Sequence, residues 1–182
     1  MSLFSVKESY EYFTNDKMIE SLKRLEVFDI YHCLLKGSLS SSIKAVSYLK
    51  YAPQGYLIWE KCCDGGLLFD TVLLSTKSHD KELDLDFDSF EDCNSQTFRD
   101  DANLDERFSV FAIRSYGDPL CFDKVAKDGR VYLWNREDKC VEVIWDTFED
   151  WLADEIDSAI RLIADGALEP LEIKLNGGGN DV

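Results

Sequence analysis

Apolar residues recur with helical spacing over the first part of the chain, which predicts a group of N-terminal helices. The pattern covers residues 8–50, and its first helix follows a capping residue at Asn15 or Asp16. The serines of residues 40–42 are placed to cap a second helix, which Pro53 ends. The apolar residues that define these helices are Met18, Ile19, Leu22, Leu25, Val27, Phe28 and Ile30, then Ile43, Val46, Tyr48 and Leu49.

A third helix is expected over residues 54–64, and two glycines lead from it into a strand. Gly65 is placed to stop the helix in a left-handed conformation, and Gly66 allows a close approach to neighbouring backbone. The apolar run over residues 67–75 then predicts a strand. A phosphate-binding loop needs the order strand, glycines, helix, so the order found here argues against a nucleotide site.

From residue 107 onward, apolar runs alternate with turn motifs, and this pattern predicts an antiparallel series of strands. The expected strands are 107–115, 120–125, 131–135 and 140–145, separated by the motifs YGDP, KDGR and REDK. A helix follows, with Thr147 as its cap, Asp150 as partner in a weak capping box, and Gly166 at its end. Residues 168–175 allow one more short strand. The apolar face of the helix holds Phe148, Trp151, Leu152, Ile156, Ile160 and Ile163.

These elements predict an α+β fold with a single domain. Its centre is a mostly antiparallel sheet of about five to six strands, with N-terminal helices and a C-terminal helix packed on it. The domain spans residues 1–175, the N-terminal helices occupy 1–64, an acidic insertion occupies 80–106, and 176–182 form a flexible tail.

The acidic insertion holds eleven carboxylates against Lys81 and Arg99. A calcium loop beginning at Asp84 has Ser89 where glycine is required, and one beginning at Asp80 has Leu85 there. Leu83, Leu85 and Phe87 alternate with aspartates, as in an edge strand or extended loop. Two interpretations stay open, a solvated acidic face and a surface that binds a partner. The residues proposed for partner binding are Asp80, Glu82, Asp84, Asp86, Asp88, Glu91 and Asp92.

The net charge of −16 limits the partners that the protein can bind. Nucleic acids and anionic membranes need a basic surface, so neither is expected as a partner. The charge suits a basic protein partner, and it equally suits plain solubility. The sequence has no apolar run long enough to span a membrane and no secretory signal, so a cytoplasmic location is expected.

The residues that carry chemistry are scattered, which predicts a protein without catalytic activity, cofactor or metal. The six cysteines form no CxxC pair, and the vicinal pair Cys62 and Cys63 bridges only with a distorted backbone. His32, at an apolar helix end, and His79, in a loop, stand apart from any serine or cysteine nucleophile. Asp118 is expected to bond its own turn rather than act with Asp123 as an acid–base pair.

The run FAIRSYGDPLCFDKVAKDGRVYLWNREDKCVEVIWDTFEDWL, residues 111–152, resembles the C-terminal half of the SUKH superfamily. An earlier mark of that superfamily, a helix ending in N-G-G before a strand, is matched by Asp64, Gly65 and Gly66. The resemblance extends over about residues 43–165 and departs from the family at APQGY, which replaces the usual L-P-x-x-Y. The positions that carry it within the run are Gly117, Asp118, Asp123, Gly129, Val131, Tyr132, Phe148, Trp151 and Leu152.

The resemblance implies a protein that binds another protein. The superfamily includes bacterial immunity proteins, which neutralise toxin domains such as nucleases, and fungal cell-wall-assembly regulators. An immunity protein for a basic toxin is the first expectation, and a regulatory scaffold is the alternative. Core packing is expected for most tryptophans, while an outward-facing Trp134 is a candidate anchor for the partner.

Overall fold

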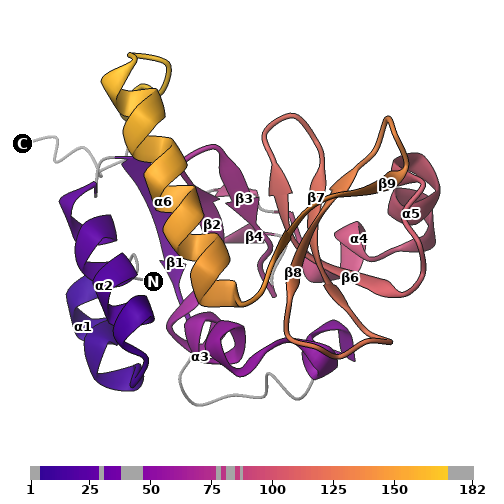
Figure 1. Cartoon of the computed structure of the whole chain (residues 1–182), viewed down its shortest axis with the longest axis horizontal. Helices are drawn as coiled ribbons and strands as arrows, with labels where there is room; N and C mark the ends of the chain where they lie inside the picture. Colours follow the sequence, from indigo (N-terminus) through magenta and orange to yellow (C-terminus); the bar gives the residue numbers. More distant parts are fainter. Residues whose placement is uncertain are drawn as a thin grey trace, which may run out of the picture.

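An antiparallel sheet of seven strands forms the centre of the molecule, in the order β1-β2-β3-β6-β7-β8-β9 (Figure 1). The structure is a computed structural model that describes residues 5–28, 31–37, 47–76, 79–80, 85–86 and 88–171. The strands are β1 (His32–Lys36), β2 (Cys63–Leu68), β3 (Thr71–Leu73), β6 (Phe108–Arg114), β7 (Pro119–Asp123), β8 (Val131–Asn135) and β9 (Cys140–Trp145). A separate two-stranded sheet pairs β4 (His79–Asp80) with β5 (Leu85–Asp86).

Helices cover both faces of the sheet. The helices are α1 (Val6–Ser9), α2 (Asp16–Val27), α3 (Gln54–Cys62), α4 (Phe90–Cys93), α5 (Gln96–Ala102) and α6 (Phe148–Ala164), with 3-10 turns at Tyr10–Tyr12 and Ser47–Tyr51. α3 and α6 pack on one face, and α2 lies beside α6, joined to it by the ion pairs Lys17–Asp150 and Arg24–Asp157 (Figure 1). On the other face, the Trp134 indole N–H donates to the carbonyl of Ala102 at the end of α5.

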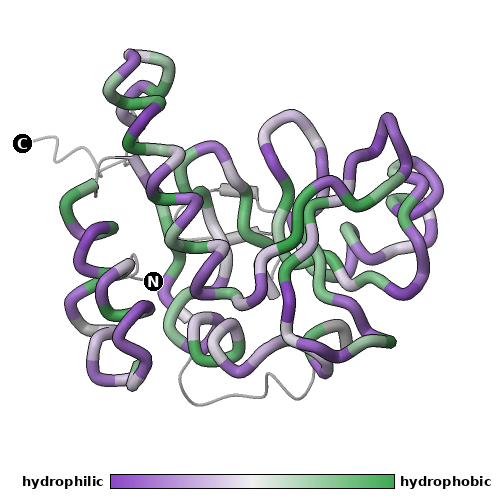
Figure 2. Tube along the Cα trace, viewed as in Figure 1, coloured by the Kyte–Doolittle hydropathy of each residue, from purple (hydrophilic) through white to green (hydrophobic). Residues whose placement is uncertain are grey.

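A cluster of aromatic rings joins α3 and α6 to the sheet. Phe111 of β6 stacks on Phe122 of β7 at a centroid distance of 4.4 Å and meets Trp151 of α6 edge to face at 5.3 Å. Tyr56 of α3 lies 5.1 Å from the Phe111 ring and 5.2 Å from Phe148. All five side chains are buried, and the strands between the helices are largely apolar in Figure 2. Aromatic pairs in these geometries add about 0.5–1.5 kcal/mol each to the free energy of burial.

A buried ion pair fixes α6 to the sheet. Arg114 of β6 places Nη1 2.7 Å from Oε1 and 2.6 Å from Oε2 of Glu155 in α6. The Thr71 hydroxyl of β3 donates to Glu155 Oε1 at 2.6 Å. Glu155 is 2% exposed, and burial raises its pKa to about 7 although Arg114 favours the charged form.

Two glycines allow β2 to run against its neighbours. Gly65 and Gly66 have φ values of +79° and +119°, and a Cβ on Gly65 would lie 2.9 Å from the Leu74 carbonyl. A Cβ on Gly66 would collide with the carbonyl oxygen of Cys33 in β1. The expected close approach at Gly66 is therefore present. Gly65 does not end the preceding helix, because that helix passes into β2 at Cys63 in an extended conformation.

The α+β class, the single domain and the C-terminal helix are confirmed, and the sheet has one strand more than the upper expectation. One strand that was not expected is β1, which lies where a helix was predicted. It pairs with β2 through the registers His32↔Leu68 and Leu34↔Gly66, so long-range pairing overrides the local helical spacing. The expected strand over 67–75 is likewise a hairpin, because the chain turns at Phe69 and Asp70 between β2 and β3.

The strands after residue 107 and the last helix lie where the pattern placed them. Thr147 caps α6 by accepting the backbone N–H of Asp150 at 3.0 Å, and Gly166 follows the helix end with φ +68°. Residues 168–171 form no strand. Several expectations lie outside the described residues, namely the cap at 40–42, Ile43 and Val46, Leu83 and Phe87, the chain beyond 171, and the tail 176–182. Within the described ranges, no helix combines the length and apolarity that crossing a membrane requires.

Replacing Phe111 should show how much the aromatic cluster contributes to stability. We expect Phe111→Ala to lower the free energy of unfolding by about 3–5 kcal/mol, because it removes a ring that touches four others. Val125→Ala, at a position 75% exposed, should change it by less than about 0.5 kcal/mol. Urea unfolding of both variants measures the difference, and a small loss for Phe111→Ala would contradict the assigned role.

Glu155 should make the stability depend on pH in a defined direction. Its pKa is about 7 in the folded chain and 4.5 in the unfolded chain, so the folded state holds the extra proton between these values. The stability of the wild type relative to Glu155→Gln should be highest below pH 4.5. It should fall by about 3 kcal/mol as pH rises through 7. Urea unfolding of both proteins across this range tests it, and a difference that rises with pH would contradict the assignment.

Candidate functional site

Asn94 anchors the acidic insertion to the sheet, because its side chain makes the pair of backbone hydrogen bonds that a neighbouring strand would make. Asn94, between α4 and α5, accepts the Val110 backbone N–H at 2.9 Å and donates to the Val110 carbonyl at 3.0 Å. Val110 lies where the register of β6 and β7 shifts, so its backbone groups are available to a side chain. Ser75 and Asp88 add a backbone hydrogen bond of 3.0 Å that ties the insertion to the end of β3.

Arg99 of α5 binds the backbone around Asn94 from inside the fold. We call this junction of α4, α5 and the start of β6 the acidic corner. The guanidinium group donates to the carbonyl oxygens of Asn94 at 3.3 Å, Asp105 at 3.2 Å and Phe108 at 2.8 Å. A fourth bond of 3.2 Å reaches the Asn94 side chain, and Arg99 is 7% exposed. The positive charge of Arg99 is therefore buried and bonded to backbone oxygens, so it is not exposed at the surface.

Seven carboxylates remain exposed around this corner, and we call them the α4–α5 acidic surface. In the described part of the chain, none of them forms an ion pair with a lysine or arginine. Lys124 lies near enough to Asp105 and Glu106 to interact with their charges, but the surface as a whole remains strongly negative. Its members are Asp88, Glu91, Asp92, Asp100, Asp101, Asp105 and Glu106.

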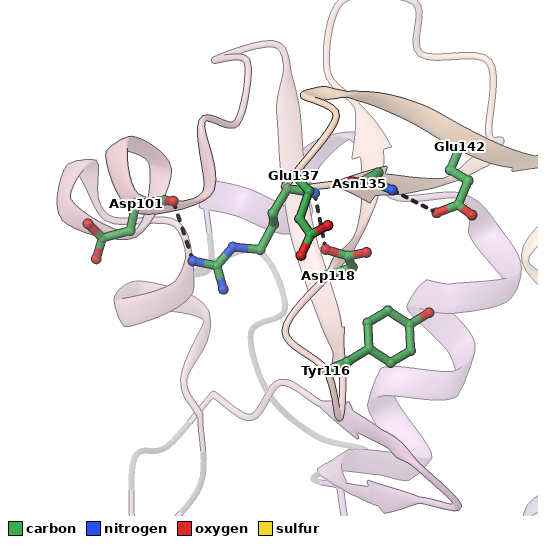
Figure 3. Close-up of a pocket in the computed structure, with 7 residues that line it drawn as sticks. Asp101, Tyr116, Asp118, Asn135, Glu137 and Glu142 are labelled. Atoms are coloured by element: carbon green, nitrogen blue, oxygen red, sulfur yellow. Dashed lines mark hydrogen bonds between the residues drawn. The ribbon is translucent and has the colours of Figure 1, made fainter.

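A cleft of about 620 Å³ adjoins this surface at Asp101 (Figure 3). It lies where the β6–β7 and β8–β9 turns meet the end of α5. Four carboxylates and one guanidinium line it, which gives a formal charge of three negative. The lining residues are Asp101, Tyr116, Asp118, Asn135, Arg136, Glu137 and Glu142.

The one guanidinium of this cleft lining does not neutralise the carboxylates. Arg136 donates to the backbone carbonyls of Asp101 at 3.4 Å and Gly117 at 3.5 Å. Gly117 has φ +98°, and a Cβ there would lie 2.9 Å from Arg136 Nη1, so glycine is needed in this turn. Within the part of the chain that the structure describes, Glu142 accepts only a neutral amide, from Asn135 at 3.4 Å (Figure 3).

The chemistry of this cleft suits recognition of a cationic side chain. Its carboxylates offer acceptors for a lysine or arginine, and Tyr116 offers an aromatic ring that is 64% exposed. Partial burial raises the pKa of Tyr116. The cleft and the α4–α5 acidic surface together form the candidate site.

The acidic residues proposed from the sequence are only partly described. Asp88, Glu91 and Asp92 are exposed members of the α4–α5 acidic surface. Asp80 and Asp86 lie in the hairpin β4–β5, and Glu82 and Asp84 fall outside the described residues. The helices α4 and α5 were not predicted from the sequence. The segment was interpreted from its acidic composition, and Ser89 and Ser95 were not recognised as helix caps.

Trp134 does not provide the outward anchor that was considered. Its side chain is 8% exposed, its ring centroid lies 5.7 Å from that of Phe108 in a tilted arrangement, and it is held by the hydrogen bond to Ala102. The chain passing over it at α5 covers the ring. Trp134 therefore lies beneath the surface near the candidate site, where it supports the end of α5.

The aspartates of the family motif hold turns. Asp118 accepts the backbone N–H of Arg136 at 3.1 Å and so joins the two hairpin turns, whereas a bond within its own turn was expected. Asp123 accepts the N–H groups of Val125 and Ala126 at 2.8 and 2.9 Å. Arg107 pairs with Asp123 at 2.7 Å.

The remaining motif residues lie in the last hairpin and in the core. Gly129 turns the chain with φ +77°, and the Tyr132 hydroxyl bonds Asp128 at 2.7 Å. Phe148 and Trp151 belong to the aromatic cluster.

Four of the six cysteines are buried, Cys33 is half-buried and Cys140 is exposed, and Cys93 lies in α4 within the segment that carries the α4–α5 acidic surface. All six are free, and burial raises the pKa of Cys62 to about 11 and of Cys93 to about 12. Cys63 and Cys121 are shifted in the same direction for the same reason. In the part of the chain that the structure describes, no group of three or more His, Cys, Asp or Glu residues is arranged to hold a metal ion.

Sequence reasoning missed most of the cleft. Tyr116, Glu137 and Glu142 were assigned to turns or strands without a role, because the cleft is formed by three elements far apart in the chain. The available signal was the placement of polar residues in the β6–β7 and β8–β9 turns, because alternate turns of an antiparallel series lie at the same end of the sheet.

Comparison with known proteins gives one match. A model of the SMI1/KNR4 family (SUKH-1) matches residues 50–154, more than half of the chain. The matched region runs from the turn before α3 into α6 and includes every residue of the cleft and of the α4–α5 acidic surface. No curated protein and no solved structure matches the chain.

Arg99 should prove essential to the acidic corner. We expect Arg99→Met to lower the free energy of unfolding by about 2–4 kcal/mol, because it leaves buried carbonyl oxygens without a donor. Arg161→Met removes an exposed arginine that bonds only Ser158, and should change stability by less than about 0.5 kcal/mol. Urea unfolding compares them, and equal losses would contradict the anchoring role.

Proposed function

Because the chain belongs to the SMI1/KNR4 family (SUKH-1), we propose that it is a non-catalytic protein-binding domain. Its proposed role is that of an immunity protein, which binds a bacterial toxin directly and neutralises it. The favoured target is a basic toxin such as a nuclease. The binding surface is the candidate site described above.

The observation that carries this proposal is the uncompensated negative charge of the site. Arg99 and Arg136 are bound to carbonyl oxygens, and in the described ranges the exposed carboxylates around them form no ion pair with a lysine or arginine. A nuclease needs a basic surface to hold the phosphates of its substrate. An acidic protein complements that surface, and charge complementarity speeds association and rejects other partners.

The chemistry of the thiols supports the non-catalytic part of the proposal. A cysteine nucleophile acts as the thiolate, and its pKa must be lowered by a neighbouring base or helix end. Burial instead raises the pKa of Cys33, Cys62, Cys63, Cys93 and Cys121. These residues pack as small apolar side chains.

The family match also supports a second candidate function. The name SMI1/KNR4 is shared with the regulators of cell-wall assembly that the sequence resembles. A scaffold of that kind would bind several cellular proteins weakly through the same surface. The number of partners and their stoichiometry distinguish the two functions.

Affinity capture with the tagged full chain tests the proposal. From the native lysate, or on co-expression with the product of the neighbouring gene, we expect one stoichiometric basic protein that high salt releases. Several substoichiometric partners would favour the scaffold. A single partner that is acidic, and whose binding ignores salt, would refute the proposed mode of binding.

Neutralising the cleft should slow association with that partner. We expect the triple variant Asp101→Asn, Glu137→Gln, Glu142→Gln to lower the association rate about tenfold at low salt and to flatten its salt dependence. The matched control Glu11→Gln, Glu20→Gln, Glu169→Gln removes three exposed carboxylates elsewhere. Surface plasmon resonance measures both, and equal rates for the two variants would remove the cleft from the binding surface.

A further inference from the structure

We propose that the outer edge of β9 binds an extended, cationic segment of the partner protein, which adds to the sheet as a further strand. The inference rests on the proposed binding function and specifies its geometry. It derives from the hydrogen bonds, exposed side chains and charges of the β8–β9 hairpin.

The backbone of β9 is open on one side. It is the last strand of the sheet, and its pairing is with β8 alone. Across the described ranges, no backbone hydrogen bond from another segment reaches β9. β1, at the opposite edge, has three of its five side chains buried, whereas none of the six in β9 is fully buried. An open edge presents a row of N–H and C=O groups to an incoming strand.

The open edge also presents apolar side chains on both of its faces. Val143 is 36% exposed and Ile144 is 51% exposed. Val143 is in register with Leu133, and Ile144 with Tyr132, so the two side chains point to opposite faces. A strand added at this edge would cover both side chains with two successive residues of its own. The occupant is therefore expected to have apolar residues at these two positions.

The charges beside the edge define the rest of the occupant. Glu142 lines the acidic cleft. Among the described residues, it accepts only from Asn135, and Asp154 of α6 accepts only the Trp145 indole N–H, at 3.1 Å. Arg130 is already paired with Asp146 beyond the end of β9, at 3.3 Å. A lysine or arginine in the occupant would therefore meet carboxylates that have no cation of their own, with the cleft as its pocket.

A second copy of this chain is a poor occupant for the same reason. Two copies would each bring a net charge of −16, and pairing through β9 would place their acidic clefts side by side. Like charges across such an interface cost several kcal/mol. The edge therefore favours a cationic segment over self-association.

Binding of designed peptides to the full chain tests this inference. The probe is a fluorescently labelled octapeptide of lysines and valines that includes two adjacent valines to cover Val143 and Ile144, followed by anisotropy at low and high salt. We expect binding that weakens with salt. A glutamate–valine peptide and a lysine–valine peptide N-methylated at every amide should each bind at least about tenfold more weakly. Absent binding of the probe, or equal binding of the N-methylated peptide, would overturn strand addition.

Variants of β9 locate the site. Ile144→Lys should weaken peptide binding about tenfold, and Glu142→Lys should do the same while removing most of its salt dependence. Val125→Lys is the matched control, because Val125 is 75% exposed in a different turn and should leave binding unchanged. Equal losses for Ile144→Lys and Val125→Lys would show a general charge effect and refute a site at β9.

Two further outcomes separate this inference from the proposed function. If sedimentation shows a dimer of the wild type that Ile144→Lys abolishes, the edge pairs with a second copy and the cationic segment is refuted. If Ile144→Lys retains the stoichiometric partner in affinity capture with unchanged affinity, the binding function stands and the β9 mode fails.

Discussion

The packing of Phe111 between the sheet and two helices is the contact on which the rest of the molecule depends. Its ring stacks on Phe122, meets Trp151 of α6, and lies beside Tyr56 of α3. These contacts fix the central strands β6 and β7, and the turns that end these strands carry Gly117, Asp118 and the acidic cleft. The same face holds the buried pair of Arg114 and Glu155, so α6 is set in position by both shape and charge.

At the acidic corner, Arg99 and Arg136 bind backbone oxygens, whereas cations elsewhere in the protein, such as Arg114, pair with carboxylates. Arg99 and Arg136 each join separate segments through carbonyl groups. A lysine could not serve equally well at Arg99, because the planar guanidinium reaches four acceptors in fixed directions. The two guanidinium groups thus serve as structural anchors and leave the exposed carboxylates to give the surface its charge.

Local patterns predicted the elements whose partners are near in sequence. The hairpins from β6 to β9 and the capped helix α6 follow from turn motifs and alternation, and they lie where expected. β1 was missed because HCLLK becomes a strand only beside Gly66, and the β2–β3 turn was missed because Phe69 adopts φ +56° without a glycine. The cleft was missed because Asp101, Tyr116 and Glu142 meet only in the fold.

Negative charge also explains how the chain can keep an open strand with exposed apolar residues. An edge such as β9, with Val143 and Ile144 accessible, invites pairing between copies and aggregation. Charged residues beside an edge oppose this, and here Glu142 and the neighbouring cleft place like charges where two copies would meet. The same charges attract a basic segment, so one arrangement of carboxylates disfavours self-association and favours the partner that the site is proposed to bind.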